Sequence, residues 1–298
     1  MCGIFGFIGE RSAAPLLIEG LRRLEYRGYD STGLVVKNGS LQMFKKVGKV
    51  TELSKILPNH IEGDTGIAHT RWATHGEPSE ENAHPHKSNE RVYIVHNGII
   101  ENYIDLKEFL KKEGYTFSSQ TDSELIAHML EYYLNKGNSM LDSMYLTKEK
   151  MEGAYAIAAI DKEDDTNVTI ARSKSPLLIG VGVDEFLAAS DPLAIGQLTN
   201  EFIFLEDGDV AELSSESYTI YDAEKKEVQR EVTQIDISSQ STSKGDYKHF
   251  MEKEIYEQPD AILNTIDGRV GGEDVLDNIF GLGSSELFEK VKRIQIVA

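Results

Sequence analysis

The residue of this chain best suited to chemistry is Cys2, which directly follows Met1 and is the only cysteine among 298 residues. Removal of Met1 would leave a thiol and a free α-amine on one residue. The amine, with a reference pKa of about 7.7–8.0, is partly neutral near pH 7 and can act as a base. A thiol is the most readily activated side-chain nucleophile. On its own, however, a lone free cysteine is more often a small buried residue of an apolar strand, so other residues must decide.

A candidate oxyanion hole lies at Asn97 and Gly98, which follow His96 at the end of an apolar stretch. An asparagine amide and an exposed glycine N–H can together hold a tetrahedral oxyanion, and glycine leaves room for a close approach. An ordinary Asn-Gly turn into the next helix fits the same letters about equally well.

A candidate carboxylate clamp lies in the stretch from His69 to Gly76. Arg71 could bind a carboxylate with two parallel hydrogen bonds, and Thr74 and His75 could add further bonds to it. The alternative is a surface arginine beside a core tryptophan, Trp72, which leaves the change from strand residues to Thr-His-Gly unexplained.

Asp122 could bind an ammonium group, although capping a helix is the commoner role for an aspartate in such a position. Both roles are compatible if Thr121 supplies the cap. An arginine for a carboxylate and an aspartate for an ammonium together describe a site for a free α-amino acid, whose side chain the thiol would attack.

Taken together and in order, these motifs resemble the class II glutamine amidotransferases, which are N-terminal-nucleophile hydrolases. The resemblance is carried by residues 2–6 (CGIFG), 26–31 (YRGYDS), 69–76 (HTRWATHG), 96–98 (HNG) and 121–124 (TDSE). Residues 27–31 and 247–259 (YKHFMEKEIYEQP) further resemble the members of this class that make amino sugar phosphates. Each motif is weak, but the combination is specific and spans the chain.

The resemblance implies a four-layer αββα sandwich that hydrolyses L-glutamine through a γ-glutamyl thioester on Cys2, with the Cys2 amine as base. It makes Asn97 and the Gly98 N–H the oxyanion hole and puts Arg27 beside the nucleophile. The residues that it implies for binding glutamine are Arg71, Thr74, His75, Gly98 and Asp122. Trp72 would guard the passage of ammonia.

The same resemblance implies no cofactor and no metal. Fructose 6-phosphate would be the ammonia acceptor, bound by sugar-isomerase domains that would follow Ala298. The longer enzyme would form a homodimer through those domains. The terminal apolar stretch at 294–298 fits this expectation, since it looks like the first strand of a truncated α/β domain.

Three other interpretations remain open. An amidophosphoribosyltransferase-like enzyme shares the opening Cys-Gly-Ile and the Asn-Gly, although the helical segment that ends at residues 257–259 argues against it. A metal hydrolase could use histidines as ligands, but two rings at 84 and 86 suit one tetrahedral ion poorly. Its candidate ligands are His69, His75, His84, His86 and His96. The third interpretation is a glutamine-binding module without catalytic activity, which is favoured if Met1 stays attached.

Composition limits the partners. The 31 basic and 50 acidic residues give a net charge of −19, which would repel a phosphate backbone, so nucleic acid is not expected as a partner. One cysteine and an N-terminus without secretory-signal character indicate the cytoplasm. No apolar run is long enough to span a bilayer, so no membrane association is expected.

The hydrophobic pattern predicts an α+β fold of two packed antiparallel sheets covered by helices, with a glutaminase domain over 1–238 and a linker and further domain over 239–298. Asn38-Gly39 and Asp207-Gly208 predict hairpin turns, and residues 121–124 predict a capping box. Strands are expected at 2–8, 34–37, 41–45, 66–73, 92–96, 154–160, 168–172, 177–181, 186–190, 202–206 and 210–213. Helices are expected from about 12 to 24 and at 103–113, 123–134, 139–151, 247–258, 261–266 and 284–292.

Glutamine hydrolysis is expected to depend on removal of Met1, because a blocked amine cannot act as the base. Intact-protein mass spectrometry of each preparation, paired with an ammonia-release assay, tests this dependence. Turnover that is equally fast with Met1 attached would contradict it.

Overall fold

The computed structural model describes residues 2–164, 167–235, 247–266, 270–271, 274–275, 284–293 and 295. The chain divides into two compact units, Met1–Thr242 and Ser243–Ala298, and each is described by itself. Every predicted site residue lies in the first unit. The predicted boundary at residue 238 and the predicted linker lie outside the described residues.

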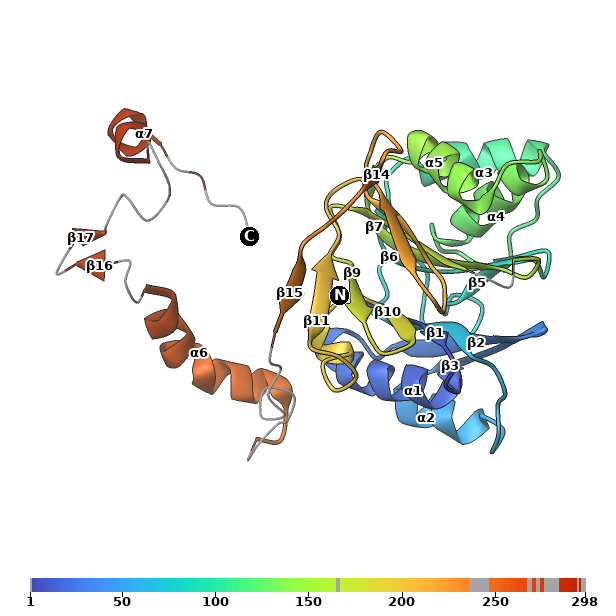
Figure 1. The fold of residues 1–298 in the computed structure, drawn as a ribbon, viewed down its shortest axis with the longest axis horizontal. Coiled ribbons are helices and arrows are strands. Elements are labelled where there is room, and N and C mark those ends of the chain that lie inside the picture. The colour runs from blue at the N-terminus through green and yellow to red at the C-terminus, as the bar shows by residue number, and fades with distance from the viewer. Residues whose placement is uncertain are drawn as a thin grey trace. The chain divides into compact units, whose positions relative to one another are not determined.

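The first unit contains two antiparallel sheets, as predicted (Figure 1). Sheet A has the order β15-β11-β9-β10-β1-β4-β2-β3, and sheet B the order β14-β13-β12-β8-β7-β6-β5. The strands of sheet A are β1 (Gly3–Gly9), β2 (Ser31–Asn38), β3 (Ser40–Val47), β4 (Thr65–Arg71), β9 (Leu178–Val181), β10 (Glu185–Ala189), β11 (Glu201–Phe204) and β15 (Val232–Gln234). Those of sheet B are β5 (His86–Ser88), β6 (Val92–Ile100), β7 (Gly153–Asp161), β8 (Val168–Ser173), β12 (Val210–Leu213), β13 (Tyr218–Tyr221) and β14 (Glu227–Val228).

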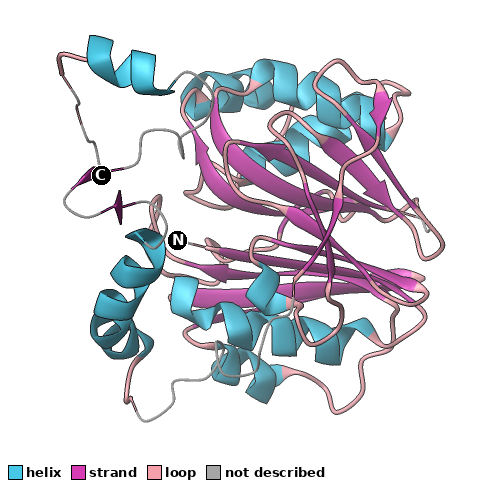
Figure 2. Ribbon diagram, turned by 60° about the vertical axis from the view of Figure 1, so that its left-hand side comes forward, coloured by secondary structure: helices cyan, strands magenta, loops and turns pink. Residues whose placement is uncertain are grey.

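Helices cover the outer faces of both sheets, which gives the predicted αββα order (Figure 2). The helices on sheet A are α1 (Ala13–Leu24) and α2 (Val50–Ile56). Those on sheet B are α3 (Tyr103–Lys112), α4 (Glu124–Leu134) and α5 (Met140–Lys150). Two short 3-10 helices, η1 (Glu25–Arg27) and η2 (Pro192–Ala194), complete the first unit.

Strand alternation explains the layers. Successive side chains of a strand point to opposite faces, so β1 sends Ile4 and Ile8 into the layer between the sheets. It sends Phe5 and Phe7 toward α1. Burial of such large apolar side chains is the main stabilising contribution to the sandwich. The same alternation directs Cys2 and Ile4 to the same side, between the sheets.

The predicted strand pattern of the first unit differs from the structure in one turn and in several short elements. The Asp207-Gly208 turn does not close a hairpin, because β11 belongs to sheet A and β12 to sheet B. Gly208 has a φ of 92°, so the turn chemistry is present, but the chain crosses between sheets there. The pattern also missed the short elements α2, β5, β13, β14 and β15.

The second unit contains α6 (Phe250–Ile266), α7 (Ser284–Lys290) and the short pair β16 (Val270–Gly271) and β17 (Asp274–Val275). The predicted break between two helices is wrong, because α6 continues through Pro259. Of the predicted terminal strand only Gln295 is described. No helix in the described part of the chain is long and apolar enough to cross a membrane.

Gly33 on β2 makes room for the segment that runs from β4 to β5. A Cβ at this position would lie 2.2 Å from the His84 carbonyl oxygen and 2.8 Å from that of Phe44. Both obstacles are backbone atoms, which cannot move aside as a flexible side chain can. The segment therefore packs against β2 at Gly33, where only glycine leaves enough room for its backbone.

Gly33→Ala is expected to lower the free energy of unfolding by about 1–3 kcal/mol, the usual cost of overpacking. Gly6→Ala is a matched control in the same sheet, since its Cβ would meet the Ala188 Cβ at 3.3 Å and Ile67 at 3.6 Å. Urea unfolding of both variants measures the difference. Equal destabilisation would contradict the close approach of His84.

Candidate active site

Cys2 lies directly before β1, beside the end of β4. Gly3 pairs with Thr70 across the two strands, which brings Cys2 next to Arg71 and Trp72. The backbone N–H of Trp72 donates a hydrogen bond to the Cys2 Sγ at 3.2 Å. Burial raises the pKa of the Cys2 thiol above its usual value, and the Trp72 N–H opposes this shift only in part. The raised pKa means that the thiol needs a base to become a thiolate.

Asn97 comes from the other sheet and meets Cys2 across the space between them. It lies within β6, and its Nδ2 donates a hydrogen bond to the Cys2 carbonyl oxygen at 3.0 Å. The residue is 8% exposed. The alternative of an Asn-Gly turn is wrong, because β6 continues to Ile100.

Gly98 has a backbone conformation that only glycine tolerates at this place. Its φ is 136°, and a Cβ would lie 1.9 Å from the Ala154 carbonyl oxygen on β7. The glycine thus allows β6 to stay paired with β7 while the backbone turns beside Asn97.

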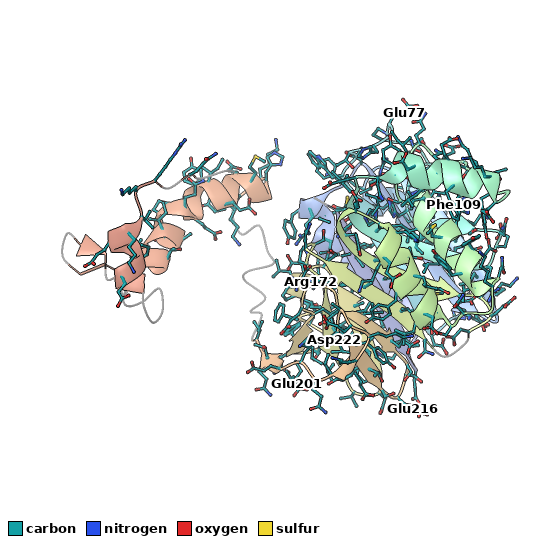
Figure 3. All side chains as sticks on the ribbon, turned by 90° about the horizontal axis from the view of Figure 1, so that it is seen from above. Glu77, Phe109, Arg172, Glu201, Glu216 and Asp222 are labelled. Atoms are coloured by element: carbon teal, nitrogen blue, oxygen red, sulfur yellow. The ribbon has the colours of Figure 1, made fainter. Side chains whose placement is uncertain are left out.

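Arg71 is buried, at 3% exposure, and its guanidinium is already engaged. Its Nη2 donates to the carbonyl oxygens of His75 and Gly76, and its Nη1 to that of Glu77 at 3.3 Å. The segment reaches the surface at Glu77, which is exposed (Figure 3). Arg71 therefore holds the backbone of the segment that carries Thr74 and His75.

The engaged donors limit how Arg71 can bind a carboxylate in this arrangement. A guanidinium has five N–H groups, and both on Nη2 are used. The remaining Nε–H and Nη1–H lie on different edges of the group, so they can make single bonds but not the predicted two-bond fork. Thr74 is exposed, and His75 is half-buried with its ring 5.5 Å from that of Tyr103.

Asp122 is close to the same site, near the end of β6. It is 3% exposed, and its Oδ2 accepts the Ile100 N–H at 2.8 Å. Burial lowers the pKa of Arg71, whereas the negative charges of Cys2, Asp30 and Asp122 raise it, so these groups all act on one guanidinium. The structure thereby brings Cys2, Arg71 and Asp122 together.

The predicted capping box at residues 121–124 is wrong. Ser123 is the N-cap of α4 and makes no side-chain cap. Thr121 Oγ1 instead faces His86 Nε2 at 3.1 Å, and Glu124 accepts the backbone N–H groups of Ser118 and Ser119. Asp122 is consequently not the cap of α4, which removes the main alternative role for its carboxylate.

Arg27 lies in η1, where its Nη1 donates to Asp191 Oδ2 at 2.6 Å. Tyr26 donates to the same oxygen, and burial together with this bond raises the pKa of Tyr26 to about 12. Asp191 also caps η2 through the Leu193 N–H. The predicted place of Arg27 beside the nucleophile stays a prediction.

The Trp72 side chain is exposed, at 49% for the residue, although the backbone N–H of Trp72 donates a hydrogen bond to the thiol. Its ring meets that of Tyr29 edge to face, with the ring centroids 6.1 Å apart. The predicted role of this exposed indole as an ammonia gate stays a prediction.

Asp30 is a site residue to which the motif analysis assigned no role. Its Oδ2 accepts the Ala73 N–H at 2.7 Å, and its own N–H donates to the Arg71 carbonyl at 3.0 Å. It therefore holds the backbone on both sides of Trp72. Its place in the Arg-Gly-Tyr-Asp-Ser motif could have indicated a role in the site. The sequence spacing, however, does not show that Asp30 contacts the backbone around Trp72.

The histidines form a buried cluster whose rings contact one another. The rings of His69 and His84 stack at 4.1 Å, and those of His84 and His86 meet edge to face at 4.5 Å. Burial is the main cause that lowers the pKa of His69 to about 3 and the pKa values of His84, His86 and His96 below their usual range. Among the described residues no group of three or more histidine, cysteine or acidic side chains could hold a metal ion.

Comparisons with known proteins bear on this geometry. Residues 69–197 match a family model described as a glutamine amidotransferase domain. The whole chain is 50% identical to a glutamine–fructose-6-phosphate aminotransferase (isomerizing) of Shewanella oneidensis and 47% identical to one of Pseudomonas putida. It covers 49% of each relative, so it spans about half the length of the curated relatives that it matches.

Solved structures show the same fold. A glutamine phosphoribosylpyrophosphate amidotransferase of B. subtilis matches with a TM-score of 0.65 and 26% identity. The alignment covers 74% of this chain and 49% of that one. A regulatory enzyme of purine biosynthesis matches over the same shares of the two chains with a TM-score of 0.66 and 27% identity.

Proposed function

The chain carries the glutamine amidotransferase domain of the glutamine–fructose-6-phosphate aminotransferases, and from this premise we propose that Cys2 hydrolyses L-glutamine to glutamate and ammonia. The observation that carries the proposal is the meeting of two sheets at the thiol. Trp72 on one side donates to Sγ, and Asn97 on the other donates to the carbonyl of the same residue.

The chemistry follows from these groups. The free amine of Cys2, exposed by loss of Met1, accepts the thiol proton, and Sγ forms a bond to the side-chain amide carbon of glutamine. The carbonyl oxygen then becomes an oxyanion beside Asn97 Nδ2 and the Gly98 N–H. Collapse breaks the C–N bond, and ammonia leaves with the proton that the amine held. Water cleaves the thioester to give glutamate and restores the thiol.

We assign the binding of glutamine mainly to two charged side chains. Asp122 would pair with the glutamine ammonium, and Arg71 with its carboxylate, aided by Thr74 and His75. The charges of Cys2 and Asp122 both act on the Arg71 guanidinium, which supports this grouping because each of them must lie near Arg71. Arg27 and Trp72 are proposed to border the nucleophile and the exit of ammonia.

The ammonia acceptor is proposed from the relatives, whose name specifies fructose 6-phosphate. In a longer protein, further domains would bind that sugar and form the homodimer, and the whole would work in the cytoplasm. A phosphoribosylpyrophosphate amidotransferase is the second candidate, supported by the structural matches. The relatives that support the first candidate are 47–50% identical over the whole chain. The structures that support the second are 26–27% identical over 74% of the chain, so the first candidate is favoured.

Cys2→Ala is expected to abolish ammonia release from glutamine and to leave the melting temperature nearly unchanged, because it removes only the Sγ atom of a half-buried residue. The assay uses chain whose Met1 is shown by mass spectrometry to be absent. Retained turnover would rule out the covalent mechanism.

Asp122→Asn is expected to raise KM for glutamine by about 10- to 100-fold with little change in kcat, because a hydrogen bond to a charged group contributes about 1.5–3 kcal/mol. Asparagine keeps an oxygen that can accept the Ile100 N–H. Steady-state kinetics separate the two constants. An unchanged KM would remove Asp122 from the substrate clamp.

A further inference from the structure

His69 contacts the side chain that is proposed to stabilise the oxyanion. It lies on β4, is fully buried, and faces β6 across the space between the sheets. Its Nε2 is 2.9 Å from Asn97 Oδ1 and 3.0 Å from the His96 carbonyl oxygen. His69 thus reaches Asn97 from the side opposite Cys2.

The hydrogen-bond partners fix which nitrogen of His69 carries the proton. Burial lowers the pKa of His69 to about 3, so the ring is neutral near pH 7 and has one N–H. The His96 carbonyl can only accept, which requires the proton on Nε2. Nδ1 is then a bare acceptor, and within the described residues it has no hydrogen-bond partner, as this assignment allows.

That assignment in turn fixes Asn97. An Nε2–H can be satisfied only by an acceptor, so the amide turns Oδ1 toward His69 and Nδ2 toward the Cys2 carbonyl, which is also only an acceptor. Two backbone carbonyls at the ends of this chain of contacts thereby determine the orientation of the amide between them.

We propose that His69 is a positioning residue for glutamine hydrolysis: its Nε2–H holds the Asn97 amide so that the donor, and not the carbonyl oxygen, faces the developing oxyanion. The proposal rests on the proposed function of Asn97. Without this bond only the Cys2 carbonyl still holds the Asn97 amide, so a rotated amide that presents a lone pair to the oxyanion is populated more often. The loss then approaches that of removing one oxyanion donor, about 10²–10³ in kcat.

Three substitutions separate the hydrogen bond from the shape of the ring. His69→Phe keeps a ring that can stack on His84 but has no donor. The Gln variant places an amide nitrogen near the position of Nε2, whereas the Asn variant is too short to do so. We expect kcat to fall about 100-fold for His69→Phe and His69→Asn, with KM within about threefold, and to recover to within about tenfold of wild type for His69→Gln.

A double-mutant cycle tests whether His69 acts through Asn97. In an Asn97→Ala background, His69→Phe is expected to change kcat less than about threefold, because the amide that it positions is gone. A 100-fold loss in both backgrounds would overturn the proposal and indicate general damage to the site. Full kcat in His69→Phe, or no recovery in His69→Gln relative to His69→Asn, would also overturn it.

Controls keep the outcomes distinguishable. His128→Phe replaces another buried histidine, 4% exposed and bonded to Ser88, and should leave kcat within about threefold. The rate of Cys2 alkylation by iodoacetamide, which forms no oxyanion, should be unchanged in every His69 variant. If Asn97→Ala alone retains full kcat, the oxyanion assignment fails, a result visible without any change at His69. If His69→Phe does not fold, the comparison of the Gln and Asn variants decides.

Discussion

The site depends on one hydrogen bond that joins the two sheets, from Asn97 Nδ2 to the Cys2 carbonyl oxygen. Cys2 belongs to an end of sheet A and Asn97 to sheet B, so the separation of these two residues is set by how the sheets pack. Apolar packing fixes the spacing of two sheets at about 10 Å but tolerates small shifts. A directional bond at 3.0 Å restricts the relative position of Cys2 and Asn97 far more narrowly than Ile4 and Val95 do in the layer behind them.

The groups of this polar connection are hydrogen-bonded to one another, although His69 Nδ1 and His96 Nε2 have no partner among the described residues. Burying an amide or imidazole without a partner costs on the order of 1–3 kcal/mol. His69 bonds Asn97, and His96 directs Nδ1 to Ser123 Oγ at 2.8 Å, so the buried polar groups extend from β4 through β6 to the residue before α4. The histidines remain neutral because a buried charge would be costly.

Residue types were enough to predict a candidate site, since a thiol, an amide beside a glycine, an arginine and an aspartate each have a characteristic chemistry. Local pattern also gave the Asn38-Gly39 hairpin between β2 and β3. The Asp207-Gly208 turn shows the limit, because the same turn chemistry serves a hairpin or a crossing between sheets, and only tertiary packing decides. Likewise, the spacing of residues in the sequence could not predict that Arg71 would donate to three backbone carbonyls or that His69 would contact Asn97.

The double engagement of Arg71 has a thermodynamic consequence. Its Nη2 holds the carbonyls of His75 and Gly76, so a carboxylate that uses the two-bond fork must displace at least one of them. A ligand that gains bonds in one arrangement and loses them in another shifts the balance between the two. Binding of an α-carboxylate and the conformation of the segment that carries Thr74 and His75 are therefore linked through a single guanidinium. A lysine, with one nitrogen and no planar fork, could not couple them in this way.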